Sequence, residues 1–206
     1  MMQQTRVLIC GNYGATNLGD EAILQSILQV ARGAFLDANI LVVSSNPELT
    51  ARQHRVDTVL MMPAGFRSML RLGKMRKTLR AFKNSDVIIF GGGGLFTDEK
   101  PHAIFIWMMQ ILPAFWYKKP VICFGQSVGP LMSRWSRFIV RNIFNKIKII
   151  IVRDEASREI LQKLGAKNIH VLPDPVFGLH TAIIAHQRQP YIVCSLRPWG
   201  GDSEKN

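Results

Sequence analysis

Short apolar runs alternate with helical stretches along this chain. The first run, residues 6–10, ends at a glycine, and residues 20–35 then repeat apolar side chains at helical spacing. Further apolar runs follow at residues 39–44, 58–62, 86–90, 120–124, 148–152 and 169–172. These runs are continuous rather than alternating, which is typical of strands buried on both faces of a parallel sheet. The pattern predicts an α/β fold with a doubly wound, mostly parallel sheet.

The alternation ends shortly after residue 172, and a less regular segment, residues 176–189, follows. One further apolar run, residues 191–196, precedes a short polar tail. A single strand with a polar tail cannot bury its own apolar side chains. We therefore expect residues 1–178 to form an N-terminal Rossmann-like domain, and residues 179–206 to form a linker and the first strand of a truncated second domain.

The most apolar stretch is residues 103–117, which Gln110 and Pro113 interrupt. It falls short of the roughly 20 residues that cross a bilayer, so we predict a buried helix. The N-terminus lacks the pattern of a signal peptide, and three cysteines stand singly inside apolar runs. Single cysteines without a partner at metal-binding spacing are typical of reduced, cytoplasmic proteins, and we expect no metal site.

The formal net charge of +12 is concentrated in two segments. Residues 66–83 carry seven Lys and Arg, residues 134–148 carry five, and neither segment contains an acid. Apolar side chains in residues 66–83 also recur at helical spacing, which predicts a basic amphipathic helix. Such a helix suits acidic lipid headgroups, nucleic acid, or simply solvent around a charged face. No nucleic-acid-binding signature accompanies the charge, so nucleic acid is the least favoured partner.

The first glycine-rich motif, GNYGATNLGDEA at residues 11–22, lies between the first strand and the first helix. Its glycines permit close backbone approach to a ligand, and the following helix offers free N–H groups to an anion. The spacing matches neither the dinucleotide-binding motif nor the P-loop. The alternative is a tight turn in which Asn17 or Asp20 caps the helix.

The second motif, GGGGLFTD at residues 91–98, directly follows an apolar run. Four consecutive glycines lose much conformational entropy on folding, so a turn alone would rarely need all of them. We expect close contact between these glycines and a ligand or another backbone.

Two further motifs carry polar side chains at strand ends. In FGQSVGP, residues 124–130, Gln126 and Ser127 can donate hydrogen bonds to a hydroxyl-rich or anionic ligand, although a polar turn explains them equally well. In VRDEAS, residues 152–157, Arg153 offers the planar fork that grips a carboxylate or a phosphate. The alternatives there are a surface ion pair with Asp154 or Glu155, or a helix cap by Asp154.

These motifs, followed by LPDPVF at residues 172–177 and CSLRPW at residues 194–199, resemble the polysaccharide pyruvyl transferase family over residues 7–199. The resemblance implies the N-terminal half of a two-domain, glycosyltransferase-B-like architecture with its active site between the domains. It also implies transfer of the enolpyruvyl unit of phosphoenolpyruvate to a sugar, commonly as a ketal, with no cofactor. The acceptor would be a lipid-linked saccharide at the inner face of the cell membrane, where the basic segments would meet anionic lipid.

This chemistry requires cations for the carboxylate and phosphate of the donor, and a general acid for its methylene carbon. By resemblance, Arg153 and Asp20 are the catalytic candidates. The substrate-binding candidates are Gly11, Tyr13, Gly14, Asn17, Glu21, Gly91, Gly92, Gly93, Gly94, Gln126, Ser127 and Arg197. No histidine lies in a glycine-rich motif, and in the family essential groups also come from the second domain. We therefore expect the isolated chain to be inactive.

Three alternatives remain open from the sequence. The chain could be part of a glycosyltransferase that uses a nucleotide sugar, a non-catalytic domain that binds anions or saccharides, or a nucleic-acid-binding module. We expect as partners phosphoenolpyruvate, a lipid-linked saccharide and an anionic membrane surface, but no nucleic acid, and leave homo-oligomers open. The expected location is cytoplasmic and peripheral at the membrane.

Overall fold

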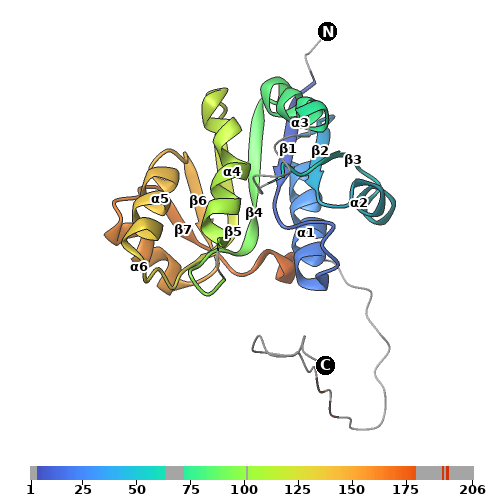
Figure 1. The fold of residues 1–206 in the computed structure, drawn as a ribbon. Helices are drawn as coiled ribbons and strands as arrows, with labels where there is room; N and C mark the ends of the chain where they lie inside the picture. Colours follow the sequence, from blue (N-terminus) through green and yellow to red (C-terminus); the bar gives the residue numbers. More distant parts are fainter. Residues whose placement is uncertain (1–3, 64–71, 101, 180–191, 193, 195–206) are drawn as a thin grey trace, which may run out of the picture.

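A computed structural model describes residues 4–63, 72–100, 102–179, 192 and 194. Seven strands form one sheet in the order β3-β2-β1-β4-β5-β6-β7 (Figure 1). All six pairs of neighbouring strands are parallel, which confirms the predicted α/β class. The strands are β1 (Arg6–Cys10), β2 (Asn39–Ser44), β3 (Asp57–Leu60), β4 (Val87–Phe96), β5 (Val121–Val128), β6 (Ile149–Val152) and β7 (Ile169–Val171).

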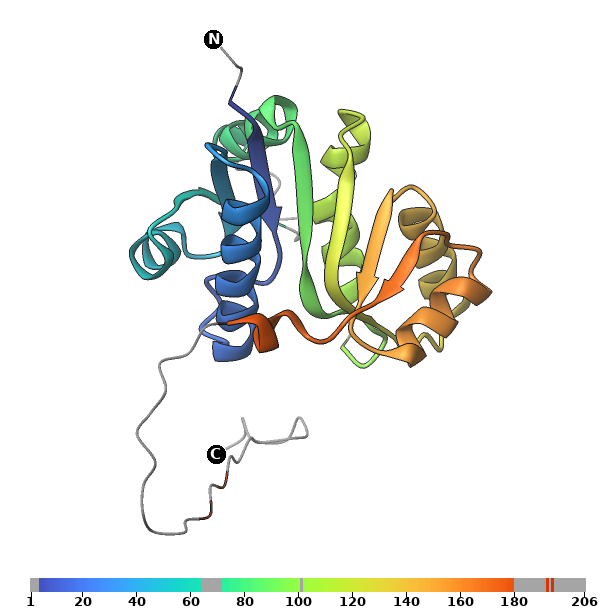
Figure 2. The same ribbon diagram turned by 180° about the vertical axis from the view of Figure 1, so that it is seen from behind.

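Helices cover both faces of this sheet. They are α1 (Leu18–Ala34), α2 (Pro47–His54), α3 (Leu72–Asn84), α4 (Ala103–Trp116), α5 (Arg134–Phe144), α6 (Glu155–Lys163) and the 3-10 helix η2 (Pro175–Gly178). Successive side chains of a strand point to opposite faces. Accordingly, Val7 and Ile9 of β1 join the core under α1, whereas Leu8 and Cys10 join the core under α3, α4 and α5. Figure 2 shows α1 and η2 in front of the sheet and α4 behind it.

Strands β4 and β5 extend beyond their predicted ends. The sequence predicted a strand only over residues 86–90, but Gly91 also pairs with Phe124 and Gly93 with Gln126 inside the sheet. A Cβ at Gly92 would collide with the carbonyl oxygen of Gly125. Gly92 therefore permits the close approach of two backbones, one of the two reasons that the sequence suggested for the glycine run.

Helix α4 forms where the sequence predicted a helix, but it is not buried on every side. Ile111 is fully buried, while Leu112 and Trp116 on the outer side are 40% and 85% exposed. Among the described residues, no helix is long and apolar enough to cross a membrane. The expected basic helix is observed from Leu72 onward as α3, and residues 66–71 lie outside the described ranges. Most of the expected strand at residues 191–196 also lies outside them.

After β7 the chain returns across the sheet to α1, as Figure 2 shows. Asp174 caps η2 by accepting a hydrogen bond from the backbone N–H of Val176, at 3.0 Å. The Ser26 hydroxyl of α1 then donates to the carbonyl oxygen of Pro175. This return brings residue 174 next to the carboxyl ends of the central strands.

Candidate functional site

A cavity of about 630 Å³ opens at the carboxyl ends of β1 and β4. The strand order reverses between these two neighbours, and open α/β sheets place their ligands at this kind of reversal. The N-terminal ends of α1 and α4 both contribute to the wall. The lining residues are Asn12, Asn17, Gly19, Asp20, Ile23, Met61, Gly93, Gly94, Leu95, Thr97, Glu99, Lys100, Ala103, Ile106, Trp107 and Arg153.

Asp20 lies in the first turn of α1 and lines this cavity. The side chain of Asn17 caps the helix by accepting from the backbone N–H of Gly19, at 3.1 Å. The Asn12 amide donates to the Asp20 carboxylate at 2.7 Å. Burial raises the pKa of Asp20, and the hydrogen bonds from Asn12 and Asn17 oppose that rise only in part. This carboxyl therefore keeps its proton to a higher pH than an exposed aspartic acid.

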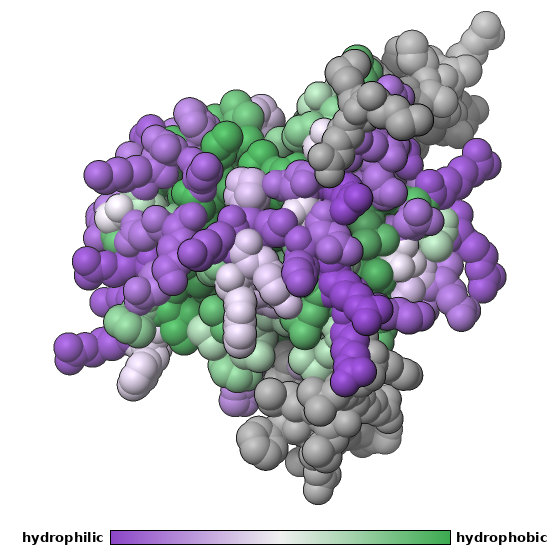
Figure 3. Space-filling view, turned by 90° about the horizontal axis from the view of Figure 1, so that it is seen from above, coloured by the Kyte–Doolittle hydropathy of each residue, from purple (hydrophilic) through white to green (hydrophobic). Residues whose placement is uncertain are grey.

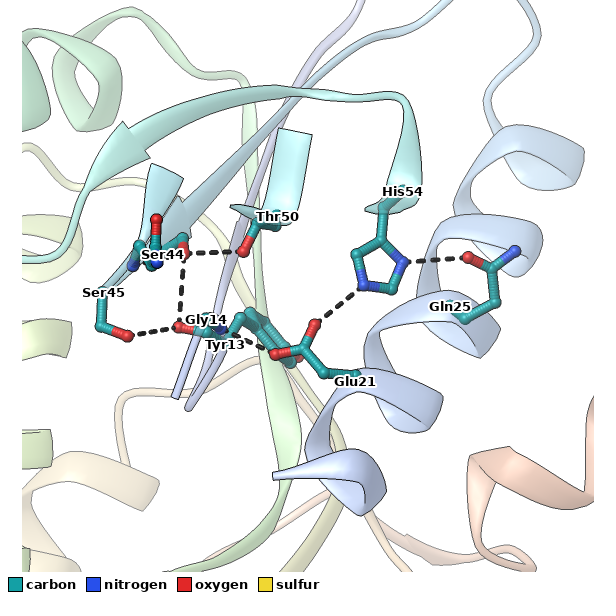
Figure 4. Close-up of polar contacts among 9 residues, drawn as sticks. Tyr13, Gly14, Glu21, Gln25, Ser44, Ser45, Thr50 and His54 are labelled. Carbon is teal, nitrogen blue, oxygen red and sulfur yellow. Dashed lines mark hydrogen bonds and ion pairs between the residues drawn. The ribbon is translucent and has the colours of Figure 1, made fainter. Parts of the chain in front are cut away.

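Glu21, the next residue, does not line the cavity and instead holds the glycine loop in place (Figure 4). One carboxylate oxygen accepts from the backbone N–H of Gly14 at 2.8 Å, and the other lies 2.8 Å from Nε2 of His54. Nδ1 of His54 lies 3.0 Å from the side-chain oxygen of Gln25. The buried His54, which the sequence placed in no motif, therefore connects α2 to the loop through Glu21.

Tyr13 lies in the core behind the cavity. Its ring packs against Gly11 and Gly91, where an added Cβ would collide with it, and its side chain is fully buried. Burial raises the pKa of Tyr13 well above its usual range. The structure thus places Tyr13, Gly11 and Gly91, three of the predicted binding residues, in supporting positions.

Arg153 follows β6 and reaches the cavity from the opposite side. Its Nε donates to the hydroxyl of Ser127 at 2.6 Å, and its Nη1 forms an ion pair with Asp174 at 2.6 Å. The sequence left open an ion pair of Arg153 with Asp154 or Glu155, or a helix cap by Asp154. The helix cap is observed, because Asp154 accepts from the backbone N–H of Ser157 at 2.7 Å, while Glu155 pairs with Arg158 at 2.6 Å.

Ser127 and Gln126 of the third motif support the site from within β5. The Ser127 hydroxyl lies 2.7 Å from the Asp154 carboxylate while it accepts from Arg153, so it orients both side chains. The Gln126 side chain is fully buried, and its amide donates to the carbonyl oxygen of Gly93. Both residues therefore act on the cavity wall rather than in the cavity.

Five of the predicted residues line the cavity together: Asn17, Asp20, Gly93, Gly94 and Arg153. Among the lining residues that the sequence did not single out, Lys100 brings a second cation and Trp107 an aromatic ring. Lys100 lies two residues beyond the second motif, and this position was the one sequence feature that could have indicated a role for Lys100 in the site. Trp107 was assigned to a buried apolar helix, and Arg197 lies outside the described residues.

Comparison with known proteins points to one family. The sequence model described as polysaccharide pyruvyl transferase matches residues 17–196. The amylovoran biosynthesis protein AmsJ of Erwinia amylovora is 25% identical over 213 residues, which cover 89% of this chain and 50% of AmsJ. The chain therefore spans about half the length of that relative.

Solved structures share the fold. HepE of Anabaena, in complex with UDP, has a TM-score of 0.53 and 14% identity, with 83% of this chain and 44% of HepE covered. A UDP-N-acetylglucosamine 2-epimerase also has a TM-score of 0.53, with 13% identity and coverage of 82% and 48%. The chain thus has the fold of one half of glycosyltransferase-B-like proteins.

Proposed function

Because this chain belongs to the polysaccharide pyruvyl transferase family, we propose that it contributes the N-terminal half of an enzyme that transfers the enolpyruvyl unit of phosphoenolpyruvate to a saccharide. The observation that carries the proposal is the cavity at the strand reversal, which Arg153 and Lys100 line together with the N-terminal ends of two helices. Cations and helix N-termini both favour an anionic ligand, and phosphoenolpyruvate carries two anionic groups.

The proposed reaction adds a sugar hydroxyl to C2 of phosphoenolpyruvate while an acid delivers a proton to the methylene carbon C3. Phosphate leaves C2, and a second hydroxyl of the same sugar closes the ketal. In this scheme Arg153 and Lys100 bind anionic groups of the donor and offset the charge that develops on phosphate. The raised pKa of Asp20 supports it as the acid from this half, because a general acid must retain its proton near the working pH.

We also propose that no cofactor takes part and that the acceptor is a lipid-linked saccharide at the cytoplasmic face of the membrane. The basic helix α3 supports this placement, since Arg76, Lys77 and Arg80 are exposed and the helix contains no acid. An enzyme held at anionic lipid would meet its acceptor by diffusion in two dimensions. The second domain of the family would supply the remaining groups, so the chain by itself is expected to be inactive.

The direct test is turnover by a form of the protein extended by the second domain. With a suitable sugar acceptor we expect consumption of phosphoenolpyruvate and release of one phosphate for each pyruvate transferred. Release of a nucleoside diphosphate from a nucleotide sugar, without use of phosphoenolpyruvate, would instead identify a glycosyltransferase.

Arg153 provides a test at a single residue. In the extended enzyme, Arg153→Lys and Arg153→Ala should each lower kcat/KM for phosphoenolpyruvate at least tenfold, about 1.4 kcal/mol of transition-state stabilisation. Lysine keeps the charge but loses the planar fork. The control is Asp174→Asn, which removes the ion-pair partner and leaves the guanidinium in place. If Asp174→Asn impairs turnover as severely as Arg153→Ala, Arg153 acts by anchoring η2 and the assignment to the donor is wrong.

A further inference from the structure

An apolar groove of about 290 Å³ lies between α3 and α4, away from the glycine loops. Its walls consist of three methionines, two leucines, Pro113 and the aromatic residues Trp116 and Tyr117. Unbranched methionine side chains adapt to flexible apolar ligands. The groove therefore has the lining of a site for a hydrocarbon chain.

The outer side of α4 continues this apolar surface. Phe105, Leu112 and Trp116 are 46%, 40% and 85% exposed, and their spacings of seven and four residues place them on one side of the helix. The helix contains no charged residue. Figure 3, turned by 90° from Figure 1 so that the molecule is seen from above, shows hydrophobic surface exposed among hydrophilic side chains. An exposed apolar stripe of this kind marks a surface that meets an apolar partner.

Cations flank the groove, and the helices beside it carry no acids. On α3, Arg76, Lys77 and Arg80 are exposed around the lining residues of the groove, and exposed Lys118 lies two residues after the end of α4. The next helix, α5, also has arginines but no acid. Arg52 of α2 and Lys163 of α6, by contrast, each have an acid one turn away. Residues 66–83 and 134–148, which span most of α3 and all of α5, together carry twelve Lys and Arg and no acid, so the excess positive charge lies on and beside this face.

The groove and the polar cavity are joined by α4 and by the chain after β3. Met61 lines the cavity and Met62 the groove. The side chain of Gln110 fixes Met62 between them, accepting from its backbone N–H at 3.2 Å and donating to its carbonyl oxygen at 2.7 Å. Trp107 in the cavity and Trp116 in the groove are nine residues apart on one helix, about 14 Å at 1.5 Å per residue.

We infer that the α3–α4 face docks on a bilayer containing anionic lipid, with one acyl chain of a lipid in the groove and Trp116 at the level of the headgroups. This inference rests on the proposed function, and it assigns the membrane contact to specific residues. Arg76, Lys77 and Arg80 contact the lipid phosphates, as basic residues beside an inserted apolar surface do. Two copies joined through this face would bring cations against cations. Nucleic acid would leave the apolar groove without a role.

Co-sedimentation of the 206-residue chain with vesicles tests the inference. We expect binding to phosphatidylcholine vesicles that contain 20–30% phosphatidylglycerol, a range chosen to give the strong negative surface potential that attracts basic segments. Leu112→Ser with Trp116→Ser, and Arg76→Gln with Lys77→Gln and Arg80→Gln, should each weaken binding at least tenfold. The altered side chains are all exposed on the surface, so these variants should fold.

Matched controls change the same residue types elsewhere. Leu18→Ser with Leu36→Ser removes two exposed leucines of 84% and 83% exposure around α1. Arg52→Gln, Arg55→Gln and Lys163→Gln together remove three exposed cations from other faces. Both controls should bind vesicles as the unaltered chain does. Equal loss of binding in the charge control would mean that net charge alone drives adsorption, and would overturn the assignment to this face.

Fluorescence shows whether the groove itself is used. Lipids brominated on the acyl chain should quench tryptophan emission of the bound chain, and Trp116→Phe should remove most of the quenched component. Sedimentation velocity without lipid tests whether this face instead joins two copies of the chain. A dimer that the double variant Leu112→Ser with Trp116→Ser dissociates would overturn the inference. In the extended enzyme these variants should turn over a water-soluble acceptor normally. Loss of vesicle binding therefore tests the docking surface, whereas absence of turnover in the unaltered enzyme tests the proposed reaction.

Discussion

At the scale of single residues, a carboxyl group in the cavity wall is costly to ionise, and Asp20 shows this most directly. Its carboxyl lines the cavity, and burial raises its pKa. Glu21, its neighbour in the sequence, carries the same functional group but serves the fold by binding the Gly14 N–H and His54. The sequence placed both residues in one motif, Asp20 as a catalytic and Glu21 as a substrate-binding candidate. It could not show that Asp20 alone of the two lines the cavity, because successive residues of a helix turn by about 100° and face different surroundings.

Asp20→Asn should raise thermal stability at neutral and alkaline pH. A carboxyl whose pKa is raised by folding contributes its stability below the unfolded pKa and loses it as the pH rises through the folded pKa. Asparagine mimics the protonated form at every pH. The Tm of the variant should therefore exceed that of the unaltered chain at pH 8, and the difference should shrink toward pH 4. A constant difference across this range would show that the ionisation of Asp20 is not its cause.

Gly92 and Gly94 form a matched pair within one strand. A Cβ at Gly92 would collide with the backbone of Gly125, whereas a Cβ at Gly94 has no atom within 4 Å. Gly92→Ala should cost about 3 kcal/mol of unfolding free energy, the upper range for overpacking, because a backbone neighbour cannot rotate away. Gly94→Ala should leave the midpoint of urea unfolding nearly unchanged. Equal effects of the two substitutions would contradict the pairing of β4 with β5 described here.

At the scale of elements, continuous apolar runs predicted the strands well, because the central strands such as β1, β2 and β4 are buried on both faces. The edge strands β3 and β7 contain no buried residue but still carry apolar runs. The extensions of β4 and β5 escaped prediction since glycines carry no side-chain pattern from which pairing could be inferred. Helix α4 was found, but its uniformly apolar sequence did not show that Trp107 lines a cavity while Trp116 is exposed. Those positions depend on which neighbours cover each side of the helix.

The start of α5 depends on a residue outside that helix. The Asp98 carboxylate accepts from the backbone N–H groups of Met132 and Ser133, at 2.6 and 2.8 Å, and from the hydroxyl of Ser136. Burial by itself would raise the pKa of Asp98. The hydrogen bonds from Ser136, Ser133 and Met132 outweigh that effect and hold the pKa below its ordinary value of 3.8.

Asp98→Ala should therefore destabilise the chain at neutral pH by about 1 to 2 kcal/mol, the usual cost of a lost helix cap. A depressed pKa gives stability that is present above the unfolded value of 3.8 and is lost as the pH falls through the folded value. The difference in Tm between variant and unaltered chain should thus disappear in strong acid. Glu48→Gln, at an exposed surface pair, serves as the control and should change Tm little. If the difference in Tm between the variant and the unaltered chain did not change with pH, the ionised carboxylate of Asp98 would not be its cause.

At the scale of the whole molecule, the cavity is assembled from residues as far apart as Asn12 and Arg153. The sequence predicted that motifs at the strand ends would lie near one another, since the carboxyl ends of parallel strands share one edge of a sheet. It did not give the order of the strands, which places β1 beside β4 and fixes the position of the cavity. The proteins that share this fold are about twice as long. Under the proposed function, this chain would supply the cradle for anionic groups and a second domain the remaining catalytic groups.

The return of the chain to α1 has a consequence for folding during synthesis. The contact between Ser26 and Pro175 joins residues 149 positions apart. At roughly 5–20 residues per second, a ribosome needs roughly 7 to 30 s to make the intervening segment. Until then α1, which carries Asp20, lacks η2 as a neighbour, and β1 lacks β4 until Val87 has emerged. Nascent chains that end before residue 174 should therefore remain sensitive to protease near α1, and those that include residue 178 should become resistant.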